Sequence, residues 1–313
     1  MMDGQRRDEW ANFLNVLPPV EYCFVYGSTL HSNTNSMIDF ILAVSDPLLW
    51  HSENLNMNKD HYASLIARAG GAKMISAVAE NIGVGVHFNP FVTWNNRKLK
   101  YGVVSTRRLI EDLQNWKSFY LSGRLQKPVH LLIDNDGVKH ANYVNLRAAV
   151  AASLLLLPSK FSQDELYSQI CGLSYMGDLR MLFAEDKQKV QKIVKGQFGL
   201  FESLYKPYVE EFRSMELLKF SSYDSQMMNV TQDCGFPATK SLVESLPPLM
   251  RAKIKGKMVI SSRDEAAHCV KKLIRRSVMI SSARQAVAGV LAAGGLNAFR
   301  YLRQKMLKAS KSR

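Results

Sequence analysis

The stretch Val25-Tyr26-Gly27-Ser28-Thr29 and, shortly after it, Met37-Ile38-Asp39-Phe40 decide the fold that this sequence predicts. Apolar residues flank both Gly27 and Asp39, as in strands that are buried on both faces. Glycine lets backbone N–H groups approach a phosphate closely, and the Ser28 hydroxyl adds a donor. The Asp39 carboxylate suits Mg²⁺, which neutralises charge on a phosphate under attack. The two strands therefore predict a site that binds a nucleoside triphosphate and transfers a nucleotidyl group.

The first 140 residues predict a small mixed sheet with helices packed against it. Five segments have the composition of strands: Glu21–Tyr26, Met37–Val44, Val84–Phe88, Lys98–Ser105 and Val129–Ile133. Trp94-Asn95-Asn96-Arg97 is expected to form a turn, and Thr106 to cap a helix over Arg107–Leu121. We therefore expect an α/β (α+β) domain of the nucleotidyltransferase type over residues 1–140.

After about residue 140 the strands are expected to end. Val144–Leu157 predicts a helix, Ser162 with Glu165 predicts a capping box for a second, and a third is expected to begin near Tyr175. Short helices joined by tight turns indicate a winged-helix-like domain over residues 141–220. Because the third helix has no basic cluster, we expect it to pack within the protein, with no nucleic-acid partner.

The net charge of +14 is concentrated at the end of the chain. Residues 251–313 contain 16 Lys and Arg against two acidic residues, so the remainder is neutral. Such asymmetry indicates contact with an anionic surface, and a solubilising basic tail is the alternative.

Residues 221–313 are expected to form an irregular connector, Ser221–Pro248, followed by three helices. The helices are predicted at Arg263–Arg276, Ser282–Ala293 and Asn297–Ala309. An apolar face bordered by basic side chains makes the last of them typical of a helix that lies on an anionic membrane. The residues expected to bind the membrane are Phe299, Arg300, Leu302, Arg303 and Met306. Packing of this helix on the protein's own core is the alternative.

The composition also excludes several classes of protein. With 47% hydrophobic and 22% charged residues, the chain is an ordinary folded protein. The four cysteines, Cys23, Cys171, Cys234 and Cys269, are far apart, which argues against a zinc site and a disulfide framework and predicts buried free thiols. No apolar run reaches the about 20 residues of a transmembrane helix, so membrane contact is expected to be peripheral.

Seven further motifs, together with the two opening stretches, resemble one family. They are His51-Ser52-Glu53-Asn54-Leu55, His61-Tyr62, Gly83-Val84-Gly85-Val86-His87-Phe88-Asn89-Pro90, Tyr101-Gly102-Val103-Val104-Ser105, Leu121-Ser122-Gly123-Arg124-Leu125-Gln126-Lys127-Pro128, Asn145-Leu146-Arg147-Ala148-Ala149, and Leu157-Pro158-Ser159-Lys160-Phe161 with Ser174-Tyr175-Met176-Gly177-Asp178. In order and spacing they are similar to the mitochondrial phosphatidate cytidylyltransferases (CDP-diacylglycerol synthases), also called the mitochondrial translocator assembly and maintenance protein family. The last of these motifs resembles plant members most. The resemblance runs from about Phe13 to beyond Asp186.

The resemblance implies a reaction and a location. CTP and phosphatidic acid would give CDP-diacylglycerol and diphosphate, with Mg²⁺ as cofactor, for phosphatidylglycerol and cardiolipin synthesis. It also implies a peripheral protein on the matrix side of the mitochondrial inner membrane. The choice of CTP follows from the resemblance alone, and the sequence does not predict an oligomeric state.

The site residues expected from the matching motifs divide by role. Asp39, Lys100, Arg124 and Lys127 are expected to be catalytic, and Gly27, Ser28, Thr29, Asn89 and Tyr101 to bind the nucleotide. Thr29 stands where most family members have glycine, so that this turn is expected to differ slightly. No general base is expected, because phosphatidate is already an ionised nucleophile.

The second metal ligand departs from the pattern of the wider superfamily. Members of the wider superfamily usually have two carboxylates one residue apart on the second strand, whereas Met37 and Ile41 flank Asp39 here. We expect Asp46 to join Asp39 as a metal ligand. Asp134 and Asp136 are further candidates, which we favour as turn or cap residues.

Two other functions remain open at the level of sequence. A nucleotidyltransferase acting on RNA would need a second carboxylate beside Asp39 and aromatic residues interleaved with the basic tail. The second carboxylate is missing, and Phe299 and Tyr301 are the only aromatic residues of the tail. A non-catalytic membrane adaptor that supports assembly of the inner-membrane translocase would have lost nucleotide binding, yet Gly27, Ser28 and Asp39 are all present.

Overall fold

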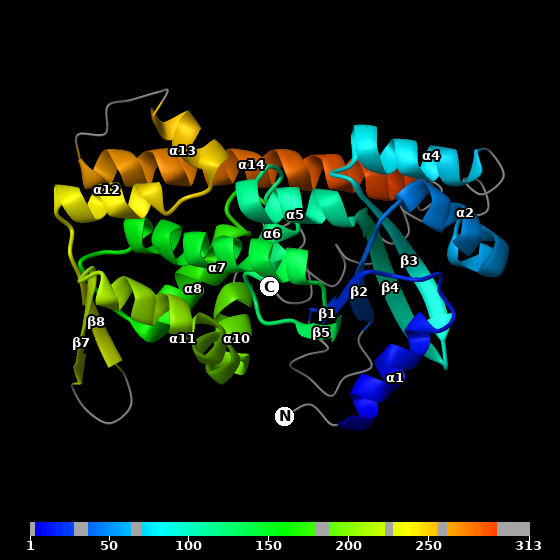
Figure 1. Ribbon diagram of the computed structural model, residues 1–313, viewed down its shortest axis with the longest axis horizontal. Coiled ribbons are helices and arrows are strands. Elements are labelled where there is room, and N and C mark those ends of the chain that lie inside the picture. Colours follow the sequence, from blue (N-terminus) through cyan, green and yellow to red (C-terminus); the bar gives the residue numbers. More distant parts are fainter. Residues whose placement is uncertain are drawn as a thin grey trace. The chain divides into compact units, whose positions relative to one another are not determined.

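The structure, a computed structural model, describes residues 4–27, 37–63, 70–178, 188–222, 228–255 and 262–292 (Figure 1). Contacts group the chain into two compact units, each considered by itself below. The first unit contains residues 1–110, 129–139 and 281–313, and the second contains residues 111–128 and 140–280. The sequence predicted three consecutive segments, whereas each unit in the structure is assembled from separate stretches of the chain.

The first unit contains a five-stranded mixed sheet with strand order β3-β4-β2-β1-β5. The strands are β1 (Tyr22–Tyr26), β2 (Ile38–Val44), β3 (Val86–Trp94), β4 (Arg97–Ser105) and β5 (His130–Ile133). The central pair of β2 and β4 is parallel, and the other neighbouring pairs are antiparallel. All five predicted strands, and the mixed sheet itself, are confirmed.

The predicted turn between β3 and β4 is also confirmed. Asn95 and Asn96 have positive φ angles of 47° and 60°, the conformation that a two-residue hairpin turn of type I′ requires. Asparagine tolerates this conformation better than other residues with a side chain, apart from aspartate. Strand β3 extends to Trp94 because the turn brings it into register with Arg97.

The helices of the first unit include α1 (Gly4–Leu14), α2 (Pro47–Met57) and α4 (Gly71–Ala77), with a 3₁₀ turn at Lys59–His61 and a π-helical turn at Val78–Ile82. Helices α1 and α2 pack against one face of the sheet, and α4 packs against α2. Phe13 of α1 and Trp50 of α2 are buried with Phe40 and Tyr101 of the sheet in one apolar core. The Trp50 indole donates hydrogen bonds to the backbone oxygens of Pro18 and Pro19, which fixes α2 against the chain that precedes β1.

The second unit is mainly helical. Its helices are α6 (Ser122–Leu125), α8 (Gln163–Leu173), α10 (Lys189–Gly196), α11 (Phe198–Ser214), α12 (Phe236–Glu244) and α13 (Pro248–Lys255), with most of α7 (Asp136–Leu156) and the first part of α14 (Arg263–Ala292). Aromatic and aliphatic residues of α7, α8 and α11 form its core. The predicted capping box is confirmed, since Ser162 accepts from the Glu165 amide and Glu165 accepts from the Ser162 amide.

The expectation that strands end near residue 140 is wrong. The second unit contains a three-stranded sheet, ordered β6-β8-β7, made of β6 (Lys160–Ser162), β7 (Leu218–Ser222) and β8 (Met228–Gln232). Strand β8 and helix α12 lie within the segment that was expected to be an irregular connector. These strands have three to five residues and contribute few apolar side chains, too few to show an alternating pattern in the sequence.

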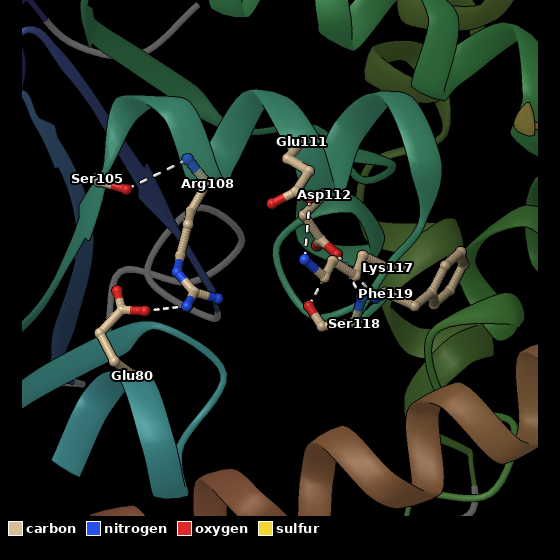
Figure 2. A network of polar contacts seen from close by, with 8 residues as sticks. All are labelled: Glu80, Ser105, Arg108, Glu111, Asp112, Lys117, Ser118 and Phe119. Carbon is tan, nitrogen blue, oxygen red and sulfur yellow. Dashed lines mark hydrogen bonds and ion pairs between the residues drawn. The ribbon is translucent and has the colours of Figure 1, made fainter. Parts of the chain in front are cut away.

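Three predicted helix boundaries are also wrong, the first being the start of α7, which begins at Asp136 and not at Val144. Helix α5 (Thr106–Asn115) is capped by Ser105, whose Oγ accepts from the Arg108 amide at 3.2 Å (Figure 2), and it ends six residues before the expected Leu121. It ends there because Trp116 takes a positive φ of 52°. Helix α14 is continuous over 30 residues, where two helices were expected.

Two further predictions concern the cysteines and the contact with a membrane. All four cysteines are free thiols, with Cys23 and Cys171 buried as expected and Cys234 exposed. Within the described residues, no helix is both long and apolar enough to span a bilayer. The predicted membrane-binding residues Phe299–Met306 lie outside the described residues.

Candidate active site

Asp39 and Lys100 lie side by side on the two central strands. In the parallel register Asp39 is paired with Lys100, and on its other side Asp39 is paired with Tyr26. The Lys100 Nζ atom is 3.9 Å from Asp39 Oδ1, and each side chain is 26% exposed. This partly accessible pair of opposite charges brings together two of the four residues that the sequence predicts to be catalytic.

Phe88 supports Lys100 and was not predicted from the sequence as a site residue. The Lys100 ammonium lies 4.4 Å from the centroid of the Phe88 ring, a distance at which a cation is attracted to an aromatic face. Gly102 makes room for that ring, since a Cβ at this position would come within 2.6 Å of it. The signal in the sequence was the glycine inside a strand, which often marks a close approach of another group.

Gly27 ends β1 beside the Asp39 carboxylate. Its φ is +100°, which side chains rarely allow, and a Cβ here would lie 3.2 Å from Asp39 Oδ2. Glycine is therefore required both by the backbone conformation and by the space that the carboxylate occupies. Ser28 and Thr29, the other predicted phosphate-binding residues, lie outside the described residues.

Asp46 lies beyond the other end of β2 and caps α2. Its Oδ1 accepts from the amides of Leu48 and Leu49 at 2.8 and 3.3 Å. From Asp39 to Val44, at the end of β2, the strand spans about 16 Å, so Asp46 cannot share a metal ion with Asp39. Antiparallel pairing places Ile133 opposite Cys23, so Asp134 and Asp136 also follow the end of the sheet remote from Asp39.

Tyr101 and Asn89 lie on the face of the sheet opposite to Asp39 and Lys100. Successive residues of a strand point to opposite faces, and Tyr101 and Asn89 are paired with each other on the buried face. Their exposed fractions are 0% and 1%. The structure therefore places these two predicted nucleotide-binding residues in the core beneath the site.

A buried polar network surrounds Tyr101. Asn54 of α2 donates one amide hydrogen to the Tyr62 hydroxyl and the other to the Tyr101 hydroxyl, both at 2.8 Å. The hydroxyl of Tyr62 lies 2.8 Å from Nδ1 of His51, and that of Tyr101 lies 3.0 Å from Nδ1 of His61. Each hydroxyl accepts from Asn54, and the tautomer of the histidine decides whether the hydroxyl donates to the imidazole or accepts from it.

Burial keeps the members of this network neutral. It lowers the pKa of His51 well below the usual range and also lowers the pKa of His61. Burial likewise raises the pKa of Tyr62 to about 12 and raises the pKa of Tyr101 well above its ordinary value. Neutral imidazoles can accept the tyrosine hydrogens, so that the network ties α2 to β4 directly under Lys100.

Acidification should weaken the folded state through these histidines. Burial lowers the pKa of His87, which lies in contact with His51, to about 4 from an ordinary value near 6.5. Between these two values the unfolded chain binds the proton and the folded chain does not, so stability is complete above pH 6.5 and falls as the pH falls towards 4. We expect His87 alone to account for a loss of about 3 kcal/mol.

Denaturant titrations at several pH values measure this loss. His87→Leu should flatten the decline, while His268→Leu, at an exposed position, should leave it unchanged. An equally steep decline in the His87 variant would contradict the assignment.

Arg124 and Lys127 belong to the second unit, in and just after α6. The Arg124 guanidinium lies 3.8 Å from the centroid of the Tyr120 ring and donates to the Tyr120 oxygen at 2.6 Å. The Lys127 ammonium donates to the Gly123 oxygen and, at 2.7 Å, to Ser174 Oγ. The structure thus brings Arg124 and Lys127 together in one unit, and Gly27, Asp39 and Lys100 together in the other.

The described residues suit a metal ion that arrives with its substrate. Within them, no group of three His, Cys, Asp or Glu side chains could hold a metal ion alone. Mg²⁺ is usually bound by one or two carboxylates together with substrate phosphates. Asp39 supplies such a carboxylate, and it lies beside Gly27, where a Cβ would come within 3.2 Å of Oδ2.

Comparison with known proteins identifies the family. The family model described as "Phosphatidate cytidylyltransferase, mitochondrial" matches residues 10–308. Proteins of that name are similar to this chain: one from Danio rerio, 46% identical over 60% of this chain and 58% of its own length; one from Homo sapiens, 36% identical over 92% and 68%; and one from Xenopus laevis, 34% identical over 97% and 95%. The match to the Danio rerio protein thus covers less than two thirds of that protein. This chain belongs to the family of mitochondrial phosphatidate cytidylyltransferases.

Proposed function

We propose that this chain transfers the cytidylyl group of CTP to phosphatidic acid, giving CDP-diacylglycerol and diphosphate. The observation that carries the proposal is the meeting of Gly27, Asp39 and Lys100 on one sheet face in a member of this family. These are the glycine turn, the carboxylate and the cation that a triphosphate site needs.

In the proposed reaction, an oxygen of the phosphatidate phosphate attacks the α-phosphorus of CTP. As that bond forms, the bond from the α-phosphorus to the oxygen bridging the β-phosphorus breaks, and diphosphate leaves with the electron pair. The chain holds the phosphates near Gly27, Ser28 and Thr29, and Lys100 neutralises charge that builds on them. Asp39 would hold Mg²⁺, which supplies Lewis-acid charge neutralisation when bound.

Arg124 and Lys127 are proposed to bind phosphate oxygens of the substrates. Arginine offers two parallel donors and lysine a point charge, and the two substrates together bring several negative charges. No histidine is needed as a base, because the lipid phosphate is already ionised. His87 fits this view, since it lies buried on the opposite face of the sheet.

The proposal extends to fold type and location. We assign the first unit to the nucleotidyltransferase type from its mixed sheet with Asp39 on a central strand. The second unit resembles a winged helix in having α8 together with the β7–β8 hairpin.

The relatives are named mitochondrial, and we place this protein on the matrix side of the inner membrane. We propose that residues 299–306 attach it there and that its product supplies cardiolipin and phosphatidylglycerol synthesis.

A substrate panel tests the proposed function. Vesicles containing phosphatidic acid should yield a cytidine liponucleotide when CTP and Mg²⁺ are supplied, and at least about tenfold less product with ATP, GTP or UTP. EDTA should abolish the product. Equal rates with all four nucleotides, or product formation that needs RNA in place of phosphatidate, would contradict the proposal.

A further inference from the structure

Asp112, near the end of α5, is a buried carboxylate that organises the chain after the helix. It is 6% exposed and accepts six hydrogen bonds of 2.7–3.1 Å from that chain. Oδ1 accepts from the amide and hydroxyl of Ser118 and the amide of Phe119, and Oδ2 from the amide of Leu121 and the amide and hydroxyl of Ser122. Figure 2 shows Asp112 pointing towards Ser118 and Phe119.

The loop that Asp112 holds is strained. Trp116 and Phe119 have φ angles of 52° and 57°, uncommon for residues with a side chain. Their rings are buried against each other, with centroids 4.7 Å apart. Strained backbone persists only where its surroundings hold it, and the six hydrogen bonds to Asp112 supply that restraint.

Asn145 of α7 fixes the same loop from the other side. Its Oδ1 accepts from the Trp116 indole at 2.8 Å and from the Gln126 amide group at 3.0 Å. Its Nδ2 donates to the Ser122 backbone oxygen at 3.1 Å. Both ends of the loop are therefore anchored to buried polar groups within the second unit.

The anchored loop carries Arg124 and Lys127. Helix α6 begins at Ser122, whose amide is already satisfied by Asp112. The Ser122 amide is thus committed within the protein, and the proposed function gives the phosphate contacts to the side chains of Arg124 and Lys127. Gly123 lies so close to Ser174 that a Cβ there would approach it to 2.6 Å, which further limits movement of α6.

We propose that Asp112 is a positioning residue, which holds the loop 116–127 so that Arg124 and Lys127 meet a substrate phosphate without rearrangement. Cations fixed in place before the substrate arrives stabilise transferred charge better than mobile ones. The inference rests on the proposed function, since that function gives Arg124 and Lys127 a phosphate to bind.

Asp112→Asn tests the proposal with a side chain of the same shape. One carboxylate oxygen becomes an NH₂ group, which would face N–H donors of the loop. We expect faster hydrogen exchange at the amides of Phe119, Leu121 and Ser122, and a KM for CTP or for phosphatidate at least tenfold higher. The Mg²⁺ concentration for half-maximal rate should stay unchanged, because Asp39 is untouched.

A variant that is less stable but keeps the loop 116–127 in place should give a different result from Asp112→Asn. Gln232→Ala removes a buried side chain of the same unit that donates to the oxygens of Leu154, Leu157 and Pro158, none of them in the loop. It should lower stability and leave both KM values unchanged, since KM does not depend on the folded fraction. If Asp112→Asn does not fold, the double variant Ser118→Ala with Ser122→Ala removes the two hydroxyl donors to Asp112 and the hydrogen bond that Ser118 Oγ accepts from the Tyr120 amide. It should raise the same KM about threefold.

The outcomes separate this inference from the proposed function. Unchanged exchange rates in Asp112→Asn, or faster exchange with both KM values within twofold of wild type, would overturn the positioning role. In the double variant, unchanged KM values would do the same. Absence of CDP-diacylglycerol with the wild-type protein would instead overturn the proposed function and remove the role that depends on it.

Discussion

Asp39→Asn should reduce the rate of CDP-diacylglycerol formation by about 100-fold or more. The substitution keeps the shape of the side chain and removes the negative charge that would hold Mg²⁺ and that lies 3.9 Å from Lys100. Loss of one group that stabilises transferred charge typically costs a factor of about 100 to 1,000 in rate. The measurement is the initial rate with saturating CTP in vesicles containing phosphatidate, together with the midpoint of thermal unfolding.

Asp46→Asn is the matched control for this prediction. Asp46 caps α2 through the amides of Leu48 and Leu49, and asparagine is an equally good residue for that position. The rate should therefore stay within about twofold of wild type, because the substitution costs at most a few tenths of a kcal/mol of stability. A large loss of activity in Asp46→Asn with normal activity in Asp39→Asn would mean that the metal site lies at the other end of β2.

Gly27→Ala should reduce activity by a similar factor for a different reason. At φ +100° an alanine costs about 1–3 kcal/mol of backbone strain, and its methyl group would lie 3.2 Å from Asp39 Oδ2. Either the turn or the carboxylate must move, and each movement disturbs phosphate binding. We expect the KM for CTP to rise and kcat to fall, with the folded structure retained in circular dichroism spectra.

Gly172→Ala controls for the general effect of replacing glycine. Gly172 lies in α8, where a Cβ would meet no atom within 4 Å. Alanine is favoured over glycine in a helix by up to about 1 kcal/mol, so this variant should be fully active and no less stable. Equal activity in the Gly27 and Gly172 variants would show that the turn at Gly27 has no part in catalysis.

The strands of the first sheet could be predicted because local patterns determine them. Apolar runs around Gly27 and Asp39 predict two strands, whereas the parallel register that places Asp39 beside Lys100 joins residues about 60 apart and was not predicted. Asn95-Asn96 predicts the hairpin turn through its tolerance of positive φ. For the strands and for the turn, the physical cause lies within a few residues of the sequence.

Other features depend on contacts between distant residues. Tyr101 follows Lys100 directly, yet the strand pleat turns it to the buried face, where Asn54 and His61 pair with it. The end of α5 is set by Asp112, whose partners follow six to ten residues later and have no recognisable motif. The sheet β6-β8-β7 joins strands about 70 residues apart in sequence, which no local pattern reveals.

The fate of the two labelled phosphates of CTP tests the central claim most directly. Wild-type protein is incubated with Mg²⁺ and phosphatidate vesicles, once with CTP labelled at the α-phosphate and once with CTP labelled at the γ-phosphate. Our account predicts that the α label enters the lipid as CDP-diacylglycerol and that the γ label leaves in diphosphate. A γ label in the lipid, or no label in the lipid from either nucleotide, would contradict it.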